Sequence, residues 1–336
     1  METEVKPKAI PVKTDMDDVF VLVLLPKLPA FKRENPLEIQ VCGRSILGWT
    51  LSSIGELPVK QIQVAKSDDI LTIVRDNSTE HKYTCVIYAD TPLLTANTFQ
   101  QAVAFVKSFG HKAVKMPRGW IFETEFIRSA ESVVPEEIPN LPPEDFIVAY
   151  SFSQLAIISA IARSRINLKH LSDGVQIVDP NTAYIDAQVT IGRGTVIEPN
   201  VYIKGEVVIG KNCHIGNCTE IKRSQIGDGT KIAHASYVGD AVIGKNCQVG
   251  CGVVFVNYNG KEKAKCTLGC KVFIGSNSNL IAPLALDDNT YIAAGSTITK
   301  DVPKHALAIS RTAQTIKESY WNMDESESQE GENPPL

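Results

Sequence analysis

The fold is decided between Tyr184 and Gly216, where the chain reads YIDAQVTIGRGTVIEPNVYIKGEVVIGKNCHIG. Every sixth residue of this stretch, from Ile185 to Ile215, is isoleucine, and a small residue often follows it. A period of six fits neither an α-helix nor the two-residue alternation of a half-buried strand. Three hexads can close one triangular coil, with the aliphatic residues pointing inward and glycine or asparagine at the corners. The stretch therefore predicts a β-solenoid of hexapeptide repeats.

The six-residue period continues through the second half of the chain, with a step of five before Ile226 and before Ile243. Somewhat more than six coils are predicted, built on nineteen inward-pointing anchors: Ile185, Ile191, Ile197, Ile203, Ile209, Ile215, Ile221, Ile226, Ile232, Val238, Ile243, Val249, Phe255, Leu268, Ile274, Leu280, Leu286, Ile292 and Ile298. An insertion after Phe255 reads VNYNGKEKAKCT (256–267). Functional residues concentrate on such polar loops, and a tolerated surface insertion is the alternative.

Three segments of this half carry a resemblance to a known family: IKRSQIGDGTKIAHASYVGDAVIGKNCQVGCG (221–252), VNYNGKEKAKCTLG (256–269) and IAAGSTITKDVPKHALAISRTAQ (292–314). They resemble the acetyltransferase half of the bacterial bifunctional enzymes that join glucosamine-1-phosphate N-acetyltransferase to N-acetylglucosamine-1-phosphate uridyltransferase. The resemblance is close from about Ile166 to Trp321. It implies a left-handed parallel β-helix, a homotrimer with active sites between subunits, and acetyl-CoA as the cosubstrate.

The resemblance also implies roles for individual residues. His234 matches the general base, which would take the proton that the substrate amine loses. Glu220 matches an acidic residue that orients this imidazole. Lys204, Lys222, Tyr237, Gln248 and Lys263 match substrate contacts, and Cys251, Asn257, Tyr258, Ser276, Ala294 and Arg311 match acetyl-CoA contacts.

Two substrate positions depart from the family. Lys204 stands where the family has a phosphate-gripping arginine, so the charge is kept and the bidentate fork is lost. Gln248 replaces an asparagine that touches the sugar. The predicted prism is also about three coils shorter on its N-terminal side, and these departures bear on the identity of the substrate.

The first half predicts a small α/β domain, because apolar runs at 19–26, 61–65 and 85–89 alternate with helix-like segments at 45–54 and 98–108. The segment YADTPLL (88–94) resembles the metal-binding motif of sugar nucleotidyltransferases, with Asp90 as an exposed, vestigial Mg²⁺ ligand. The family's phosphate-cradling loop is rich in glycine, whereas residues 25–36 contain none. We expect a reduced domain without uridyltransferase activity, retained for packing, assembly or ligand sensing, with Mg²⁺ bound only if some function persists.

These patterns divide the chain into six parts. They are a flexible tail (1–15), the nucleotidyltransferase-like domain (16–144), a helical linker (145–174), the β-helix (175–303), a C-terminal arm (304–321) and an acidic, disordered tail (322–336).

Composition narrows the function classes. The net charge of −4 argues against a nucleic-acid binder, and no apolar run is long enough to span a membrane. The N-terminal residues lack the apolar region of a signal peptide, so we expect a cytoplasmic protein with reduced cysteines. Cys213 and Cys247 are expected inside the prism. The pair Cys266 and Cys270 lacks a histidine or a second pair, so no metal site is expected there.

We therefore expect an N-acetyltransferase that uses acetyl-CoA and acts on glucosamine-1-phosphate or a close amino-sugar phosphate, in the biosynthesis of UDP-N-acetylglucosamine-type sugar nucleotides. Two alternatives stay open. One is an acetyltransferase for a nucleotide-linked amino sugar, which Lys204 and Gln248 favour, and the other is a non-catalytic assembly or regulatory protein that keeps the fold.

Overall fold

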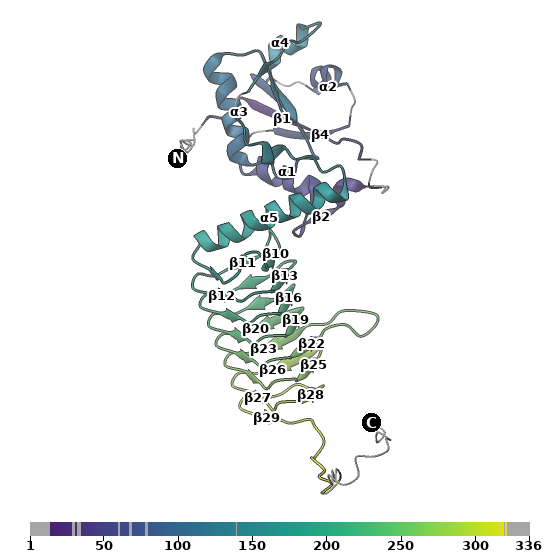
Figure 1. The fold of residues 1–336 in the computed structure, drawn as a ribbon, viewed down its shortest axis with the longest axis vertical. Coiled ribbons are helices and arrows are strands. Elements are labelled where there is room, and N and C mark those ends of the chain that lie inside the picture. Colours follow the sequence, from purple (N-terminus) through teal and green to yellow (C-terminus); the bar gives the residue numbers. More distant parts are fainter. Residues whose placement is uncertain are drawn as a thin grey trace, which may run out of the picture.

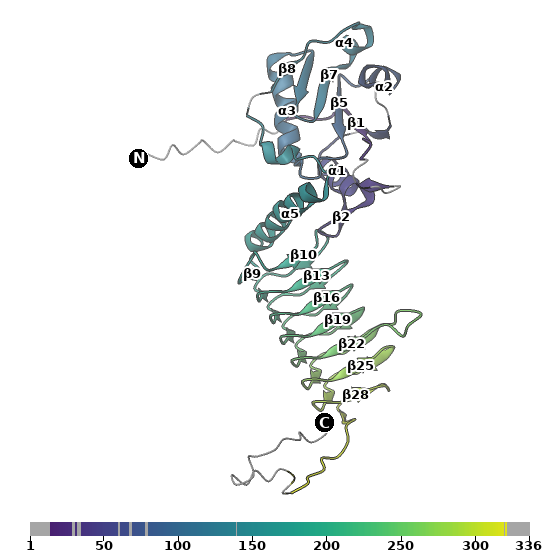
Figure 2. The same ribbon diagram turned by 45° about the vertical axis from the view of Figure 1, so that its right-hand side comes forward.

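The computed structural model describes residues 14–28, 31, 35–59, 61–66, 69–77, 80–138, 140–318 and 320, so most of the first predicted tail and all of the last lie outside it. The chain forms an α/β domain above a long β-helix, and helix α5 (Phe152–Ser172) lies between them (Figures 1 and 2). In the part of the chain described, no helix combines the length and the apolar character needed to cross a membrane.

The α/β domain is built on one mixed six-stranded sheet. The strands in spatial order are β4 (Gln61–Ala65), β1 (Val19–Leu24), β5 (Tyr83–Tyr88), β7 (Gly119–Glu123), β6 (Ala113–Met116) and β8 (Glu136–Glu137). Strand β1 runs parallel to both β4 and β5, whereas β7 is antiparallel to β5 and β6.

Both faces of this sheet are covered because β1 is apolar at every position and successive side chains point to opposite faces. Val19, Val21 and Val23 pack in one cluster with α1 (Ile46–Gly55), α3 (Ala96–Phe109) and the start of α5. Phe20, Leu22 and Leu24 pack in another with α2 (Ile70–Asn77) and α4 (Thr124–Ser129). The predicted strands and helices of this half are confirmed to within about two residues at each end.

The second half is a prism of three parallel sheets, which we number 1, 2 and 3 in the order in which each coil visits them. Sheet 1 holds β10 (Tyr184–Ile185), β13 (Tyr202–Lys204), β16 (Glu220–Lys222), β19 (Tyr237–Gly239), β22 (Val254–Val256), β25 (Asn279–Ile281) and β28 (Thr297–Ile298). Sheet 2 holds β11 (Thr190–Ile191), β14 (Val208–Ile209), β17 (Gln225–Ile226), β20 (Ala241–Ile243), β23 (Cys266–Leu268) and β26 (Leu284–Leu286). Sheet 3 holds β9 (Gln176–Ile177), β12 (Val196–Ile197), β15 (His214–Ile215), β18 (Lys231–Ile232), β21 (Gln248–Val249), β24 (Phe273–Ile274), β27 (Tyr291–Ile292) and β29 (Leu307–Ala308).

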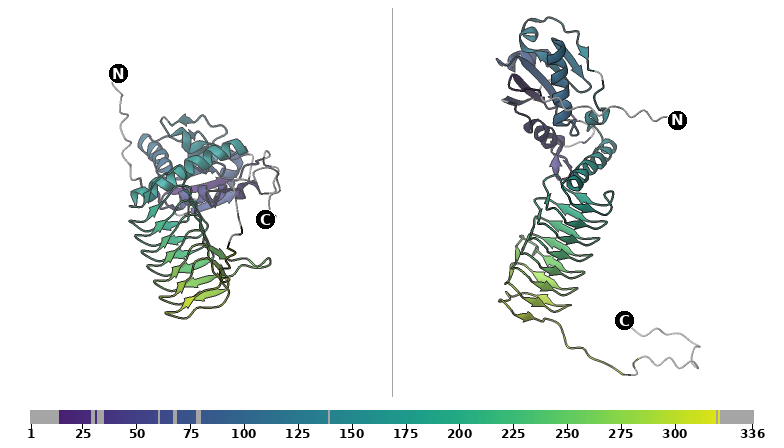
Figure 3. Two further views of the ribbon diagram at one scale, coloured as in Figure 1. Left: turned by 60° about the horizontal axis from the view of Figure 1, so that its bottom comes forward. Right: turned by 90° about the vertical axis from the view of Figure 1, so that its left-hand side faces the viewer.

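The hexad pattern is confirmed throughout the prism. All nineteen predicted anchors lie in strands β10 to β28, and every one is buried. Anchors of successive coils pair in register, as Ile185 with Ile203 and Ile203 with Ile221 show. Cys213 and Cys247 are buried as expected. The predicted class, a parallel β-helix of hexapeptide repeats that follows a smaller α/β domain, is confirmed, and Figure 3 shows the stacked coils from two further sides.

Two elements connect the domains. Helix α5 contributes Ile158 to the core of the α/β domain and Ile166 to the core of the prism. The hairpin of β2 (Gln40–Val41) and β3 (Arg44–Ser45) turns at Cys42 and Gly43, and the Cys42 carbonyl accepts a hydrogen bond from the Ala187 amide at 2.9 Å. Gly43 has a φ of 76°, and a Cβ there would lie 2.4 Å from Cγ of Asp186, so only glycine fits this contact.

Candidate functional site

A column of exposed and partly exposed residues runs down the corner between sheets 3 and 1. The second residue of each four-residue corner stacks on the one in the next coil, giving the order Asn217, His234, Cys251, Ser276 and Ala294, which we call the corner column. The third residue of each corner has a left-handed backbone conformation. Its amide donates a hydrogen bond to the carbonyl of the column residue one coil earlier, as Gly252 does to His234 (3.2 Å) and Asn277 does to Cys251 (2.8 Å).

The corner column ends at Arg311, whose Nη1 donates to the Ala294 carbonyl oxygen at 2.7 Å. Five predicted residues, His234 among them, therefore lie along one line, spaced by about 4.8 Å per coil. The small side chains of Ser276 and Ala294 leave the lower part of this line open.

The face of sheet 1 beside this column carries the predicted substrate lysines. Lys204, on β13, pairs in register with Lys222, on β16, so the two ammonium groups come from adjacent strands and the same outward face. The Lys222 Nζ lies 2.7 Å from Oε1 of Glu220. Tyr237 follows in the next strand, in register with Glu220, and lies three residues after His234.

The insertion after Phe255 forms a loop of residues 257–265 between β22 and β23, which we call the extended loop. It leaves sheet 1 after β22, where the ribbon projects from the prism (Figures 1 and 2). Its base is closed by a hydrogen bond from the Ala264 amide to the Asn257 carbonyl (2.9 Å), and Tyr258 bridges to Lys263. Asn257 is buried, and its side-chain nitrogen lies 3.4 Å from the Tyr237 hydroxyl. A Cβ on Gly239 would lie 2.6 Å from that nitrogen, so glycine at 239 makes room for the contact.

Sequence reasoning missed two residues under this loop. Arg223 donates to both oxygens of Asp240, from Nε at 2.6 Å and from Nη2 at 2.7 Å, and Asn257 donates to the same carboxylate. The hydrogen bonds from Arg223 hold the pKa of the Asp240 carboxyl below its usual range, with smaller contributions from Asn257 and Lys263. The two residues are 17 apart, which is one coil, and this spacing between opposite charges is the signal that could have revealed the pair.

Within one chain, two predicted site residues are not brought together with the other residues of the predicted site. Glu220 makes its ion pair with Lys222, and within the described residues no hydrogen bond or ion pair joins it to His234. Gln248 lies on sheet 3, between Lys231 and Phe273, so within one chain it does not meet the lysines of sheet 1.

The expectation that Asp90 is an exposed strand-end carboxylate is wrong. Asp90 is 1% exposed, and Arg118 donates to it from Nε (3.1 Å) and Nη2 (2.6 Å). The guanidinium also stacks on Tyr88, 3.9 Å from its ring centroid. Because Arg118 occupies both oxygens and neutralises the charge, this carboxylate does not fit the role of a Mg²⁺ ligand.

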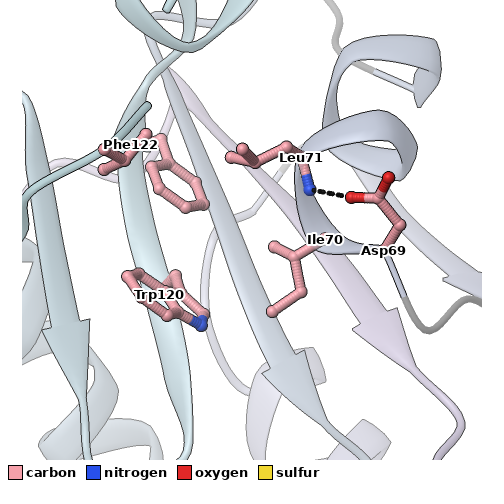
Figure 4. A pocket seen from close by; sticks show the side chains of 6 residues that line it. Asp69, Ile70, Leu71, Trp120 and Phe122 are labelled. Carbon is pink, nitrogen blue, oxygen red and sulfur yellow. Dashed lines mark hydrogen bonds between the residues drawn. The ribbon is translucent and has the colours of Figure 1, made fainter. Parts of the chain in front are cut away.

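The α/β domain has a pocket of about 370 Å³ between α2 and strand β7 (Figure 4). It is lined by Asp69, Ile70, Leu71, Trp120, Phe122 and Val133. Asp69 accepts a hydrogen bond from the Leu71 amide at the start of α2. The Asp69 carboxylate therefore caps the N-terminal end of α2, and the other residues that line the pocket are apolar.

Among the residues that the structure describes, no cluster of three or more His, Cys, Asp or Glu side chains is arranged to hold a metal ion.

Three parallel sheets closed by hexads, with one extended corner loop, define a β-helix protein of the hexapeptide-repeat class. A family model for the GMPPB C-terminal domain matches residues 177–259. Curated relatives named Bifunctional protein GlmU include those of Levilactobacillus brevis, 41% identical over 218 residues, and of Acetivibrio thermocellus, 42% identical over 218 residues. These matches cover 50% of this chain and 48% and 47% of the relatives. The resemblance is confirmed: along about half of its length this chain is similar to the GlmU proteins, and it spans about half the length of these relatives.

A solved structure of Francisella novicida UDP-N-acetylglucosamine acyltransferase is a more distant neighbour. It is 20% identical, with a TM-score of 0.34, over 41% of this chain and 59% of its own.

Proposed function

We propose that this protein transfers the acetyl group of acetyl-CoA to the amine of an amino-sugar phosphate, with glucosamine-1-phosphate as the acceptor. The observation that carries the proposal is the corner column. It aligns His234 with the open positions Ser276 and Ala294 and with the cation Arg311, beside the lysine-bearing face of sheet 1. The similarity to the GlmU proteins supports the same reading.

In this reaction the substrate amine attacks the thioester carbonyl, and the bond to sulfur breaks. His234 would take the proton released by the amine, a transfer suited to a histidine near neutral pH. Coenzyme A would leave as the thiol after its sulfur gains a proton. The exposed position of His234, in the corner that precedes β19, leaves its imidazole accessible to both substrates.

The charges match the two anionic substrates. Lys204 and Lys222 would hold the sugar phosphate, and the Glu220 carboxylate fixes the direction of the Lys222 ammonium. Acetyl-CoA would lie along the corner column, where small side chains allow close approach and Arg311 supplies a cation for its phosphates.

The test is release of coenzyme A thiol by the full chain with acetyl-CoA and a panel of amino sugars, with and without the 1-phosphate and including UDP-glucosamine. The His234→Ala variant should lower turnover at least a hundredfold, because removing a general base typically costs 10²–10⁴. The matched control is His305→Ala, which removes an exposed corner histidine outside the column. Wild-type turnover in the His234 variant would contradict the role of this residue. If none of the amino sugars in the panel supports thiol release, the proposed function is wrong.

We further propose that the α/β domain does not form UDP-N-acetylglucosamine from UTP and N-acetylglucosamine-1-phosphate. Nucleotidyl transfer needs metal-bridged phosphates, and the carboxylate that would bind the metal is paired with Arg118 instead. Pyrophosphate release, measured with UTP, Mg²⁺ and saturating sugar phosphate, should stay at background and should not change in Asp90→Ala. A clear rate that this variant abolishes would contradict the proposal.

A further inference from the structure

The root of the extended loop rests on one residue of the coil above it. Asp240 occupies the corner between β19 and β20 with a φ of 51°, and the loop is inserted at the same corner one coil later. The amide of Cys266, where the loop ends, donates to the Asp240 carbonyl at 3.3 Å. Asn257, where the loop begins, donates to the Asp240 carboxylate through its side chain. Both ends of the loop are therefore tied to one corner.

The carboxylate of Asp240 is itself fixed. It is 9% exposed, and the bidentate contact from Arg223 holds it in one orientation. The backbones of both partners are anchored too: the Arg223 amide donates to the Lys204 carbonyl at 3.2 Å, and the Asp240 amide donates to the Lys222 carbonyl at 3.0 Å. The chain of contacts thus starts at the two substrate lysines and ends at the loop.

We propose that Asp240, held by Arg223, is a positioning residue for the proposed transfer: it fixes Asn257 and so sets where the extended loop presents Tyr258 and Lys263. The inference rests on the proposed function for its kinetic consequence only. Asn257 also lies against the Tyr237 hydroxyl, so displacing it changes the surroundings of the tyrosine as well.

The first measurement does not depend on activity. The loop carries Lys261, Lys263 and Lys265, so trypsin cleavage within 257–265, followed by mass spectrometry, reports how firmly its root is held. In Asp240→Asn the Asn257 amide loses a charged acceptor, and cleavage should accelerate at least tenfold. The control is Asp228→Asn. It alters another corner aspartate, which lies away from the loop and forms an ion pair with Lys245 at 3.2 Å, so this variant should be cleaved like the wild type.

A second variant keeps the test decisive if Asp240→Asn folds poorly. Asn257→Ala removes the same contact from the loop side and leaves Asp240 paired with Arg223. It should accelerate cleavage to a similar degree, and the double variant should cleave no faster than the faster single variant, because both substitutions delete one interaction. Folded variants whose loops cleave at the wild-type rate would overturn the proposal.

The kinetic measurement separates positioning from general damage. Asp240→Asn should raise the KM for the amino-sugar phosphate at least fivefold while its melting temperature stays close to that of Asp228→Asn. An unchanged KM with a loosened loop would overturn the catalytic part of the inference. A wild-type chain without acetyltransferase activity would instead contradict the proposed function and leave the cleavage result standing.

Discussion

Arg311 is the cation at the end of the corner column, and it is exposed. We predict that Arg311→Ala weakens acetyl-CoA binding by roughly 1.5–3 kcal/mol, the range of a hydrogen bond to a charged group. Isothermal titration with acetyl-CoA measures the loss. Arg193→Ala, which removes an exposed arginine at another corner, is the control. Equal affinities for the two variants would contradict the place given to Arg311.

At the scale of residues, sequence resolves some contacts and misses others. Each hexad repeats one aliphatic anchor at a fixed spacing, so the nineteen anchors can be predicted from the pattern alone. The partner of Asp90 is Arg118, which lies 28 residues later in the turn between β6 and β7. No local sequence pattern indicates that Arg118 pairs with Asp90. Asp240 and Arg223 are a middle case, because their spacing of 17 residues is readable once the coil length is known.

At the scale of elements, α5 carries a titratable group into the junction. His170 is 6% exposed, and burial, followed by the nearby Lys169, lowers the pKa of its imidazole. On acidification the unfolded chain therefore binds a proton before the folded chain does. Stability should fall as the pH drops below the ordinary histidine value of about 6.5, until the folded-state pKa is passed.

Thermal melts between pH 7 and pH 5 measure this effect, above the range in which the carboxylates of Asp173, Asp228 and Asp240 titrate, since their pKa values are lowered. The fall in melting temperature should shrink in His170→Gln and persist in His305→Gln, an exposed histidine. Equal falls in both variants would contradict the assignment.

The same helix shows why element boundaries are harder to predict than elements. The periodicity of residues 145–171 predicts one helix, whereas the structure has a short 3-10 turn at Pro143–Phe146 and begins α5 at Phe152. Ser151 caps α5 by accepting a hydrogen bond from the Gln154 amide. Asp145, before the helix, is instead buried and paired with Arg165 of α5. This ion pair joins residues 20 apart, so no local pattern in the sequence reveals it.

At the scale of the whole molecule, the predicted substrate residues are divided between two faces. Gln248 lies on sheet 3, whereas Lys204 and Lys222 lie on sheet 1. Gln248 and the two lysines can contact one substrate only if Gln248 comes from one subunit and the lysines come from another. This agrees with the trimer that the resemblance implies. We predict a solution mass of three times the chain mass of 36.7 kDa by light scattering. A monomer at concentrations that support full activity would contradict a shared site.

The pair of Asp90 and Arg118 has a consequence for the evolution of the α/β domain. A carboxylate able to bind a cation can arise here only if Arg118 is replaced, and that single step leaves a buried charge without its partner. Breaking a buried pair typically costs 3–5 kcal/mol, and the partial exposure of Arg118 places the cost near the lower end. The total stability of a folded protein is typically only about 5–15 kcal/mol. A chain that has lost Arg118 but keeps Asp90 is therefore selected against. Once such a pair has formed, either reverting mutation is harmful by itself, so the metal-binding arrangement is hard to regain.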